Sequence, residues 1–401
     1  MIIQYWDKSL NIGIFIGVFW VIFTSLNLLP VSLYGEIEFW FAGIKVFTIL
    51  GFMVFAICVD VGVGQQGYLG FRYWVDPGPF APYLLDSTGS TAKFVGFWAV
   101  LIQAAFSYQG AELVGIGAGE AINPRKSVPM AIRKTFYRIL FLFCFTIFFI
   151  GLLVPYNNPD LLSNAEDATA SPLVIAAKLA GIRVLPGLIN AVLLTAVLSA
   201  ANSDTYCGSR IVVGLCQEGF APKFFARASK RGVPYYSVGL TAAVGLLGFL
   251  NLSEDGSNAF NWLLNITTVA GLISWACINL CHIQFMRALS ARNIPRTTLP
   301  YRAPGQPYLA YYGLCMTVLV ILTQGFTAFI PWDTREFFVA YVSLILFVVM
   351  FAGHKLVYRT KVVQSLDADL DTGRKEVDAM VFDGDEKGVP RNWLVKVWKW
   401  L

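Results

Sequence analysis

The chain has 401 residues, of which 56% are hydrophobic and only 14% are charged, and its formal net charge is +5. Soluble domains carry about 25% charged residues, so the composition excludes an ordinary water-soluble domain and favours a membrane protein. The seven cysteines form no C-x-x-C pair, which argues against a metal site or a disulfide framework. We expect no cofactor and no nucleic-acid partner.

Nine apolar stretches are long enough to cross a bilayer, which takes about 20 helical residues. Such segments must be helices here, because backbone polar groups in lipid need internal partners. The sequence therefore predicts an all-α polytopic protein, with a membrane domain over 1–357 and a charged tail over 358–401 outside the membrane. The predicted spans are about 11–29, 38–61, 94–117, 137–154, 185–203, 236–252, 260–285, 309–330 and 336–356.

Lysine and arginine concentrate in alternate loops between these spans. The segments 120–138, 204–235 and 286–308, together with the tail from 355, hold 23 of the 30 basic residues. The positive-inside rule predicts that these segments and the C-terminus are cytosolic. Nine spans would then leave Met1 outside, with no device for translocating it, so we expect an odd number of further helices upstream unless one span is miscounted.

The second predicted span contains a lysine, Lys45, which lies seven residues after Glu38 and about 10 Å deep at 1.5 Å per residue. Its side chain could extend to the cytosolic surface. Alternatively, an amine kept away from water could load and release a proton. The sequence gives these two interpretations equal weight.

The third span carries FSYQGAE over Phe106–Glu112, followed by a glycine-rich stretch. Transporters place interrupted helices near the bilayer midplane, where unwound backbone binds substrate. Glycines beside Gln109 and the intramembrane carboxylate of Glu112 therefore favour a binding site. The alternative is a GxxxG packing face at Gly115 and Gly119, with Glu112 paired to a neighbouring helix.

Two further polar stretches lie in later spans. Ser199–Arg210 is a polar string that either lines a cavity or forms an ordinary polar helix end. Asn261–Gly271 is followed by Trp275, which could act as a gate, although buried tryptophan is more often only a packing residue. The chain contains no H-E-x-x-H, G-x-S-x-G or P-loop motif, so we expect no enzyme activity.

Long motifs run along the whole chain, from IIQYW near its start to RNWLVKVWKW at its end. Between them lie FSYQGAELVGIGAGEAINPRKSVPMAI, GLLVPYNNP, ANSDTYCGSRIVVGL, EGFAPKFF, WLLNITTVAG, LPYRAPGQPY and QGFTAFIPW. Together they resemble the fungal amino-acid permeases, the yeast amino-acid transporter family of the amino acid–polyamine–organocation superfamily. The AANSDTYCGSR and CHIQFMRAL segments and the LDADLDTGRKEVDA tail are most similar to the basic amino-acid permeases.

That family has twelve helices in a five-plus-five inverted-repeat fold. The resemblance implies that this chain corresponds to helices four to twelve, and that its broken sixth helix binds the substrate amino group through carbonyls near Ser107–Gln109. It also favours a proton-coupling role for Lys45. The implied substrate-binding residues are Phe106, Ser107, Tyr108, Gln109, Gly110, Glu112, Thr267, Thr268 and Trp275, and the implied proton-coupling residues are Lys45, Glu112 and Glu120.

The resemblance implies a plasma-membrane symporter that imports an L-amino acid together with a proton, with basic amino acids as first choice and neutral ones as second. The cytosolic tail would be a target for ubiquitin-ligase adaptors at Lys375 or Lys387. Two alternatives are a permease-like amino-acid sensor and a non-functional fragment that lacks the first three helices.

Overall fold

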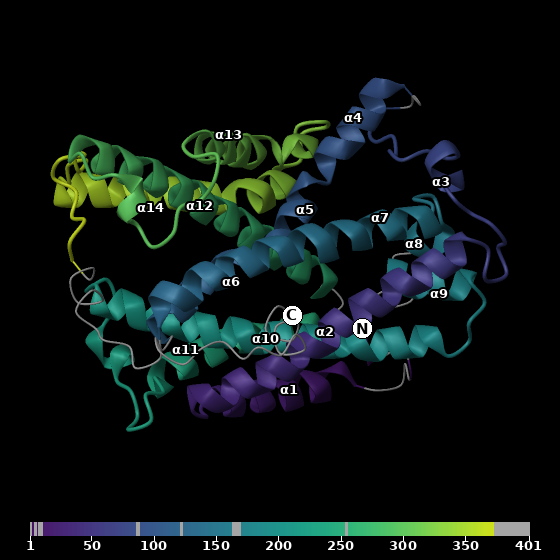
Figure 1. The fold of residues 1–401 in the computed structure, drawn as a ribbon, viewed down its shortest axis with the longest axis horizontal. Helices are drawn as coiled ribbons and strands as arrows, with labels where there is room; N and C mark the ends of the chain where they lie inside the picture. Colours follow the sequence, from purple (N-terminus) through teal and green to yellow (C-terminus); the bar gives the residue numbers. More distant parts are fainter. Residues whose placement is uncertain are drawn as a thin grey trace. The chain divides into compact units, whose positions relative to one another are not determined.

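The computed structural model describes residues 2, 3, 6, 11–85, 89–120, 123–162, 170–252 and 256–372, and of residues 118–120, 162, 251 and 256–261 only the backbone. The described residues form helices and their connections, with no β-strand among them. Figure 1 shows these helices in chain order. The chain divides into two compact units, one with Met1–Ala81 and Arg133–Glu254, the other with Pro82–Ile132 and Asp255–Lys396.

The first unit is built on two long helices, α2 (Val31–Asp60) and α10 (Leu185–Gln217), which pack against each other. Helix α10 also contacts α1, α9 and α11, whereas α2 contacts α7. The indole of Trp20 on α1 donates a 2.7 Å hydrogen bond to the carbonyl of Ala242 on α11. The other α-helices of this unit are α1 (Ile12–Asn27), α3 (Arg72–Val75), α7 (Cys144–Leu153), α8 (Pro159–Leu162), α9 (Pro172–Leu179) and α11 (Tyr235–Gly245).

The second unit is centred on α12 (Gly256–Ala291), which packs against α5 (Leu101–Tyr108), α13 (Tyr308–Thr323) and α14 (Thr334–Tyr358). Its core consists of buried apolar side chains on α5, α12 and α13, namely Ile102, Val269, Leu272, Ile273 and Ile321. Helix α4 (Ser90–Ala99) and the 3₁₀ helices η2 (Ala111–Glu120), η7 (Arg296–Thr298) and η8 (Phe326–Ala328) complete this unit, and α6 (Pro124–Arg138) begins in it.

Seven helical segments in the described part of the chain are long and apolar enough to cross a membrane, and two shorter apolar helices accompany them. Each of these nine segments overlaps one of the nine predicted spans, although several extend beyond the predicted bounds. The seven are Val31–Asp60, Ser90–Gly117, Pro124–Leu153, Leu185–Gln217, Trp262–Ala291, Tyr308–Ala328 and Thr334–Tyr358, and the two are Ile12–Asn27 and Tyr235–Leu250. The all-α, multi-pass prediction is thereby confirmed.

The fourth span begins earlier than its apolar run predicts. Helix α6 starts at Pro124, continues through a π-helical stretch, η3 (Ile139–Phe143), and leads into α7. Asn123 supplies an N-terminal cap, because its Oδ1 accepts a 3.3 Å hydrogen bond from the backbone N–H of Lys126. Proline is well suited to the first helical position, where its missing N–H costs nothing. Capping residues, rather than hydropathy, therefore define where this helix starts.

Helix α9 was not predicted, because at eight residues it is too short to read as a span. It lies between two predicted spans, and its central residues are buried: Val174, Ile175 and Ala177 have no exposed surface. Together with residues of α2 and the end of α7, Ile175 forms the main apolar core of the first unit. The helix therefore belongs to the packed interior of this unit rather than to a surface loop.

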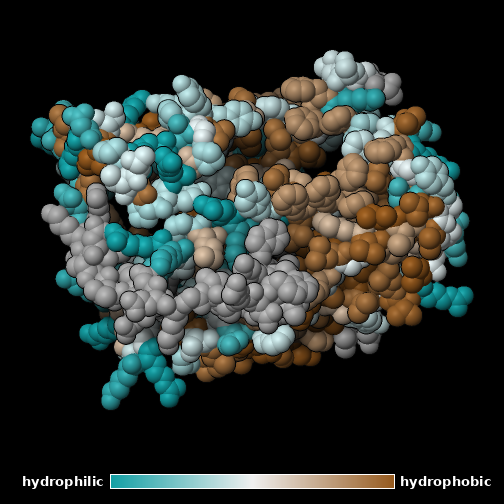
Figure 2. Space-filling view, viewed as in Figure 1, coloured by the Kyte–Doolittle hydropathy of each residue, from teal (hydrophilic) through white to brown (hydrophobic). Residues whose placement is uncertain are grey.

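The surfaces of the helices are strongly apolar. Helix α14 exposes large hydrophobic side chains at every position from Ile345 to Phe351. Figure 2 shows apolar side chains gathered over a broad part of the visible face. Soluble monomers rarely expose contiguous apolar patches larger than a few hundred Å², so these helix faces are suited to lipid.

Candidate functional site

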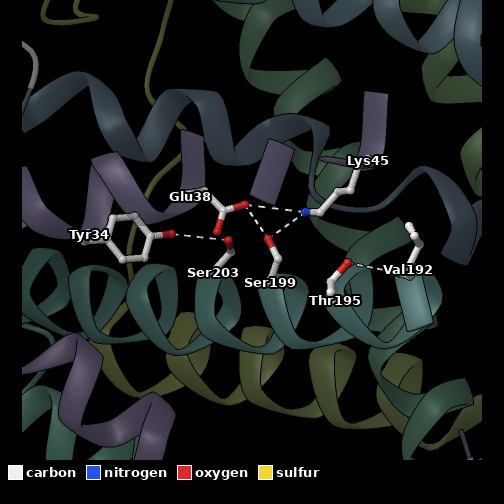
Figure 3. A network of polar contacts seen from close by, with 7 residues as sticks. All are labelled: Tyr34, Glu38, Lys45, Val192, Thr195, Ser199 and Ser203. Atoms are coloured by element: carbon white, nitrogen blue, oxygen red, sulfur yellow. Dashed lines mark hydrogen bonds and ion pairs between the residues drawn. The ribbon is translucent and has the colours of Figure 1, made fainter. Parts of the chain in front are cut away.

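In the first unit, two intramembrane helices meet through a charged network. Lys45 on α2 donates a 2.6 Å hydrogen bond to Ser199 Oγ on α10, and Ser199 in turn donates a 2.5 Å bond to Glu38 Oε1. The Lys45 ammonium lies 3.5 Å from the same carboxylate oxygen. Figure 3 shows the three side chains pointing toward one another between the helices. The network thus closes a triangle of ammonium, hydroxyl and carboxylate.

Glu38 is not among the predicted site residues, because the apolar run that predicts the second span begins at Glu38. The helix starts at Val31, so Glu38 lies two turns inside it, and its spacing of seven residues puts it on the same face as Lys45. Its second oxygen, Oε2, is buried and has no hydrogen-bond partner among the described residues. The carboxylate therefore retains an unused acceptor beside the lysine.

The polar string that begins at Ser199 lies within helix α10, which continues to Gln217, so it is not an ordinary helix end. Ser203, one turn after Ser199, accepts a 3.2 Å hydrogen bond from the hydroxyl of Tyr34 on α2. The Tyr34 ring also stacks on Tyr206 at 4.1 Å between centroids. One face of α10 thus carries a row of hydroxyl groups against α2.

In the second unit, the third predicted span is interrupted at the FSYQGAE motif. Helix α5 ends at Tyr108, Gln109 has an extended backbone, and Gly110 has a φ of 96° before η2 begins. That φ lies in the left-handed region, which glycine adopts without the steric penalty of a Cβ atom. Because a helix end leaves carbonyls without their usual partners, the break can offer backbone acceptors to a ligand.

Gln109 bridges this break to helix α12. Its Nε2 donates hydrogen bonds of 3.3 Å and 3.0 Å to the carbonyls of Thr267 and Thr268. The approach depends on Gly271, because a Cβ built at that position would lie 2.0 Å from the same Nε2. The hydroxyls of both threonines donate to carbonyls of their own helix, and Thr268 is fully buried. The structure therefore brings three of the predicted site residues together.

Glu112 forms the second contact between the broken helix and α12. Its Oε2 accepts a 3.1 Å hydrogen bond from the indole of Trp275 and a 3.2 Å bond from the backbone N–H of Gly110. The carboxylate of Glu112 thus stabilises the turn at Gly110 and contacts Trp275, the predicted gate residue. The interpretation of Trp275 as a packing residue only does not account for this bond.

The remaining predicted residues are placed as follows. Phe106 is exposed on α5, and the Ser107 hydroxyl donates to the carbonyl of Gln103 within the same helix. Tyr108 is the last residue of α5. The backbone of Glu120 ends η2, but its side chain lies outside the described residues. Lys45 belongs to the first unit and Glu112 to the second.

Comparison with known proteins identifies the family. A family model described as "Amino acid permease" matches residues 1–367. The lysine-specific permease of Saccharomyces cerevisiae is 46% identical over 99% of this chain and 65% of its own length. The basic amino-acid permease of the same yeast is 44% identical, over 95% of this chain and 67% of its own length.

The lysine/arginine permease CAN1 of Candida albicans is 42% identical over 99% of this chain and 70% of its own length. This chain therefore spans about two thirds of the length of the curated relatives that it matches. The family and these relatives are named for transport, not for catalysis. With a matched region that covers most of its residues, the chain belongs to the amino acid permease family.

Proposed function

We propose that this chain acts in a plasma-membrane importer that takes up L-amino acids together with protons, with basic amino acids as preferred substrates. Family membership supports amino-acid transport, and three similar relatives are named for lysine, arginine or basic amino acids. The preference for basic substrates rests on those names and on the carboxylate of Glu112 at the helix break.

Substrate binding is assigned to the break between α5 and η2. Carbonyls near Ser107–Gln109 would accept hydrogen bonds from the substrate ammonium group, and Glu112 would add a negative charge. Thr267, Thr268 and Trp275 would form the α12 side of the site. The bonds of Gln109 and Glu112 to α12 support this assignment, because they couple the shape of the break to the position of that helix.

Proton coupling is assigned to Lys45, and the triangle with Ser199 and Glu38 is the observation that carries this part of the proposal. A protonated amine donates to both partners, whereas a neutral amine can accept from Ser199 and leaves the carboxylate of Glu38 without a counter-charge. Unpairing a charge in a low-dielectric environment is costly. Loss of the proton would therefore favour a different packing of α2 against α10.

The C-terminus is assigned to the cytosol, and the concentration of Lys and Arg in alternate loops supports this assignment. Ubiquitin attachment at Lys375 or Lys387 remains a prediction, since both residues lie outside the described part of the chain. Replacing both lysines by arginine and following internalisation after substrate addition tests it; unchanged internalisation would count against it.

Uptake of radiolabelled arginine, lysine and leucine at pH 5 and pH 7.5 tests the proposed function in yeast that lacks its own amino-acid permeases. The chain is compared with a fusion in which the residues of the lysine-specific permease that precede the matched region are joined to its start. We expect the fusion to import arginine and lysine faster at pH 5. A fusion that reaches the cell surface and imports none of the three would contradict the proposal.

A further inference from the structure

A polar cavity lies in the second unit, lined on α5 by residues that precede the helix break. It has a volume of about 180 Å³ and is lined by residues of α4, α5, α12 and α14, the turn after α13 and the segment before α4. Its polar lining residues are Tyr83, Gln103, Asn265, Gln324, Thr327 and Glu336. Drug-sized ligands occupy pockets of about 300–1,000 Å³, so this cavity is suited to a smaller group.

The charge of the cavity is negative. Glu336, in the first turn of α14, is the one ionised group among the described lining residues. The adjacent basic residue, Arg335, is directed to Trp262, with its guanidinium carbon 4.5 Å from the ring centroid. The nearby carboxylate of Asp333 instead caps α14, because its Oδ1 accepts from the backbone N–H groups of Arg335 and Glu336. Glu336 therefore lines the cavity without a cationic partner among the described residues.

The uncharged polar side chains that line the cavity have hydrogen-bond donors and acceptors that the described residues do not use. The side-chain amides of Gln103 and Asn265 make no hydrogen bond with any described residue. Gln324 uses its Nε2 on the carbonyl of Ala340, which leaves its amide oxygen as an acceptor. Amide oxygens and a carboxylate together accept from ammonium or guanidinium groups. An anion would find a negative charge and no basic side chain.

We propose that this cavity binds the cationic side chain of a basic amino acid, at a site separate from the one that holds its α-amino group. The proposal rests on the proposed function for the identity of the ligand. The carboxylate of Glu336 would attract the cation, and the amides of Gln103 and Asn265 would take its remaining donors. A free amino acid would present its side chain to the cavity, because the side-chain charge is uncompensated whereas the α-ammonium is accompanied by a carboxylate that Glu336 repels.

Binding of n-butylguanidinium to the purified full chain tests the site without requiring transport. The neutral n-butylurea has nearly the same shape and serves as the matched ligand. We expect the protein to bind the cation, and Glu336→Gln to weaken that binding about 1.5-fold to fivefold, which is the effect of one exposed charge. Binding of n-butylurea should stay weak in both proteins.

Glu218→Gln is the matched control, since Glu218 is an exposed carboxylate in the other unit and does not line the cavity. It should leave binding of the cation unchanged. Ala99→Leu fills the cavity with an apolar side chain while keeping Glu336, and it should also remove binding of the cation. Because two different variants test the site, misfolding of one of them would not leave the proposal untested. Cation binding that is absent, or that is equal in the protein and its Glu336→Gln and Ala99→Leu variants, would overturn the proposal.

Arginine uptake by the fusion described above separates the two hypotheses. If Glu336 is needed for n-butylguanidinium binding but the fusion imports no arginine, the cavity assignment holds and the proposed function fails. If arginine uptake is proton-dependent but cation binding ignores Glu336, the cavity assignment fails alone. If both hold, Glu336→Gln should raise the KM for arginine about 1.5-fold to fivefold with little change in the maximal rate.

Discussion

The ammonium of Lys45 lies closer to the Ser199 hydroxyl than to the Glu38 carboxylate, at 2.6 Å against 3.5 Å. Lys45 and Glu38 are 31% and 24% exposed in their side chains, whereas Ser199 is completely buried. The buried hydroxyl therefore relays the interaction between the two charged groups. Their energies should depend on each other, because residues in one hydrogen-bond network are not additive.

A double-mutant cycle tests this dependence. Lys45→Met and Glu38→Gln should each lower the free energy of unfolding by about 1–3 kcal/mol, since each leaves a polar partner unsatisfied. The double variant should lose less than the sum. Denaturation of the purified protein in detergent measures the three values, and Glu36→Gln, an exposed carboxylate on the same helix, is the control. Strictly additive losses would show that the triangle is not a coupled unit.

Gly271 should be as important for substrate binding as any polar residue near it. Gly271→Ala places a Cβ 2.0 Å from the present position of Gln109 Nε2, so Gln109 must move and lose its bonds to α12. Loss of such a hydrogen bond costs about 0.5–1.5 kcal/mol, which corresponds to a KM for arginine raised about twofold to twelvefold. Gly115→Ala, where nothing lies within 4 Å of the added Cβ, is the matched control. Equal kinetics for both variants would argue against a role for Gln109.

The turn after α14 gives a pH prediction outside the membrane. A hydrogen bond from the Thr372 hydroxyl, followed by backbone N–H groups of Thr372 and Asp371, lowers the pKa of Asp369 from its ordinary 3.8 to about 2. Because the folded pKa is depressed, the stabilisation is complete above the ordinary value and is lost as the pH falls through about 2. The turn should therefore be unaffected between pH 5 and pH 7.5.

Titration of Asp369 by NMR of side-chain-labelled protein checks this value. Thr372→Val removes the hydroxyl donor and should raise the pKa of Asp369 toward 3.8. Lys361→Gln, which alters an exposed charge after α14 without touching Asp369, should leave the pKa of Asp369 nearly unchanged. A Thr372→Val variant whose Asp369 still titrates near 2 would contradict the assignment of the hydroxyl as the main cause.

Among the elements, the seven long apolar helices of the described chain could be predicted because each combines length with high hydropathy. Their boundaries were less accurate where capping residues precede the apolar run. Pro30 before α2 and Asn123 before α6 are the local signals that would have corrected two starts. With α2 begun at Val31, Glu38 would have been recognised as intramembrane.

Substitution of a buried residue of helix α9 tests whether this helix belongs to the core of the first unit. Ile175→Ala should lower the free energy of unfolding by about 2–5 kcal/mol, because Ile175 is fully buried between α9, α2 and α7 and its truncation leaves a cavity. Val184→Ala, at a position 79% exposed, should change it by less than about 0.5 kcal/mol. Thermal unfolding of the purified variants gives both values, and similar losses would mean that α9 is not part of the core.

For the whole molecule, the helix break at Gln109–Gly110 could be anticipated from glycine and polar residues within an apolar span, but its partners could not. The bonds from Gln109 to Thr268 and from Glu112 to Trp275 join residues more than 150 positions apart in sequence. A single sequence carries no signal for such pairings. The acidic cavity was missed for the same reason, since Gln103, Asn265 and Glu336 come from three separate helices.

The proposed coupling of basic amino-acid movement to proton movement through Lys45 can be measured directly. The fusion protein is placed in liposomes that contain a pH-sensitive dye, and an inward arginine gradient is applied. We predict acidification of the lumen when arginine is added, and its loss in Lys45→Met at equal protein incorporation. Arginine uptake without acidification, or acidification that Lys45→Met leaves unchanged, would contradict the account.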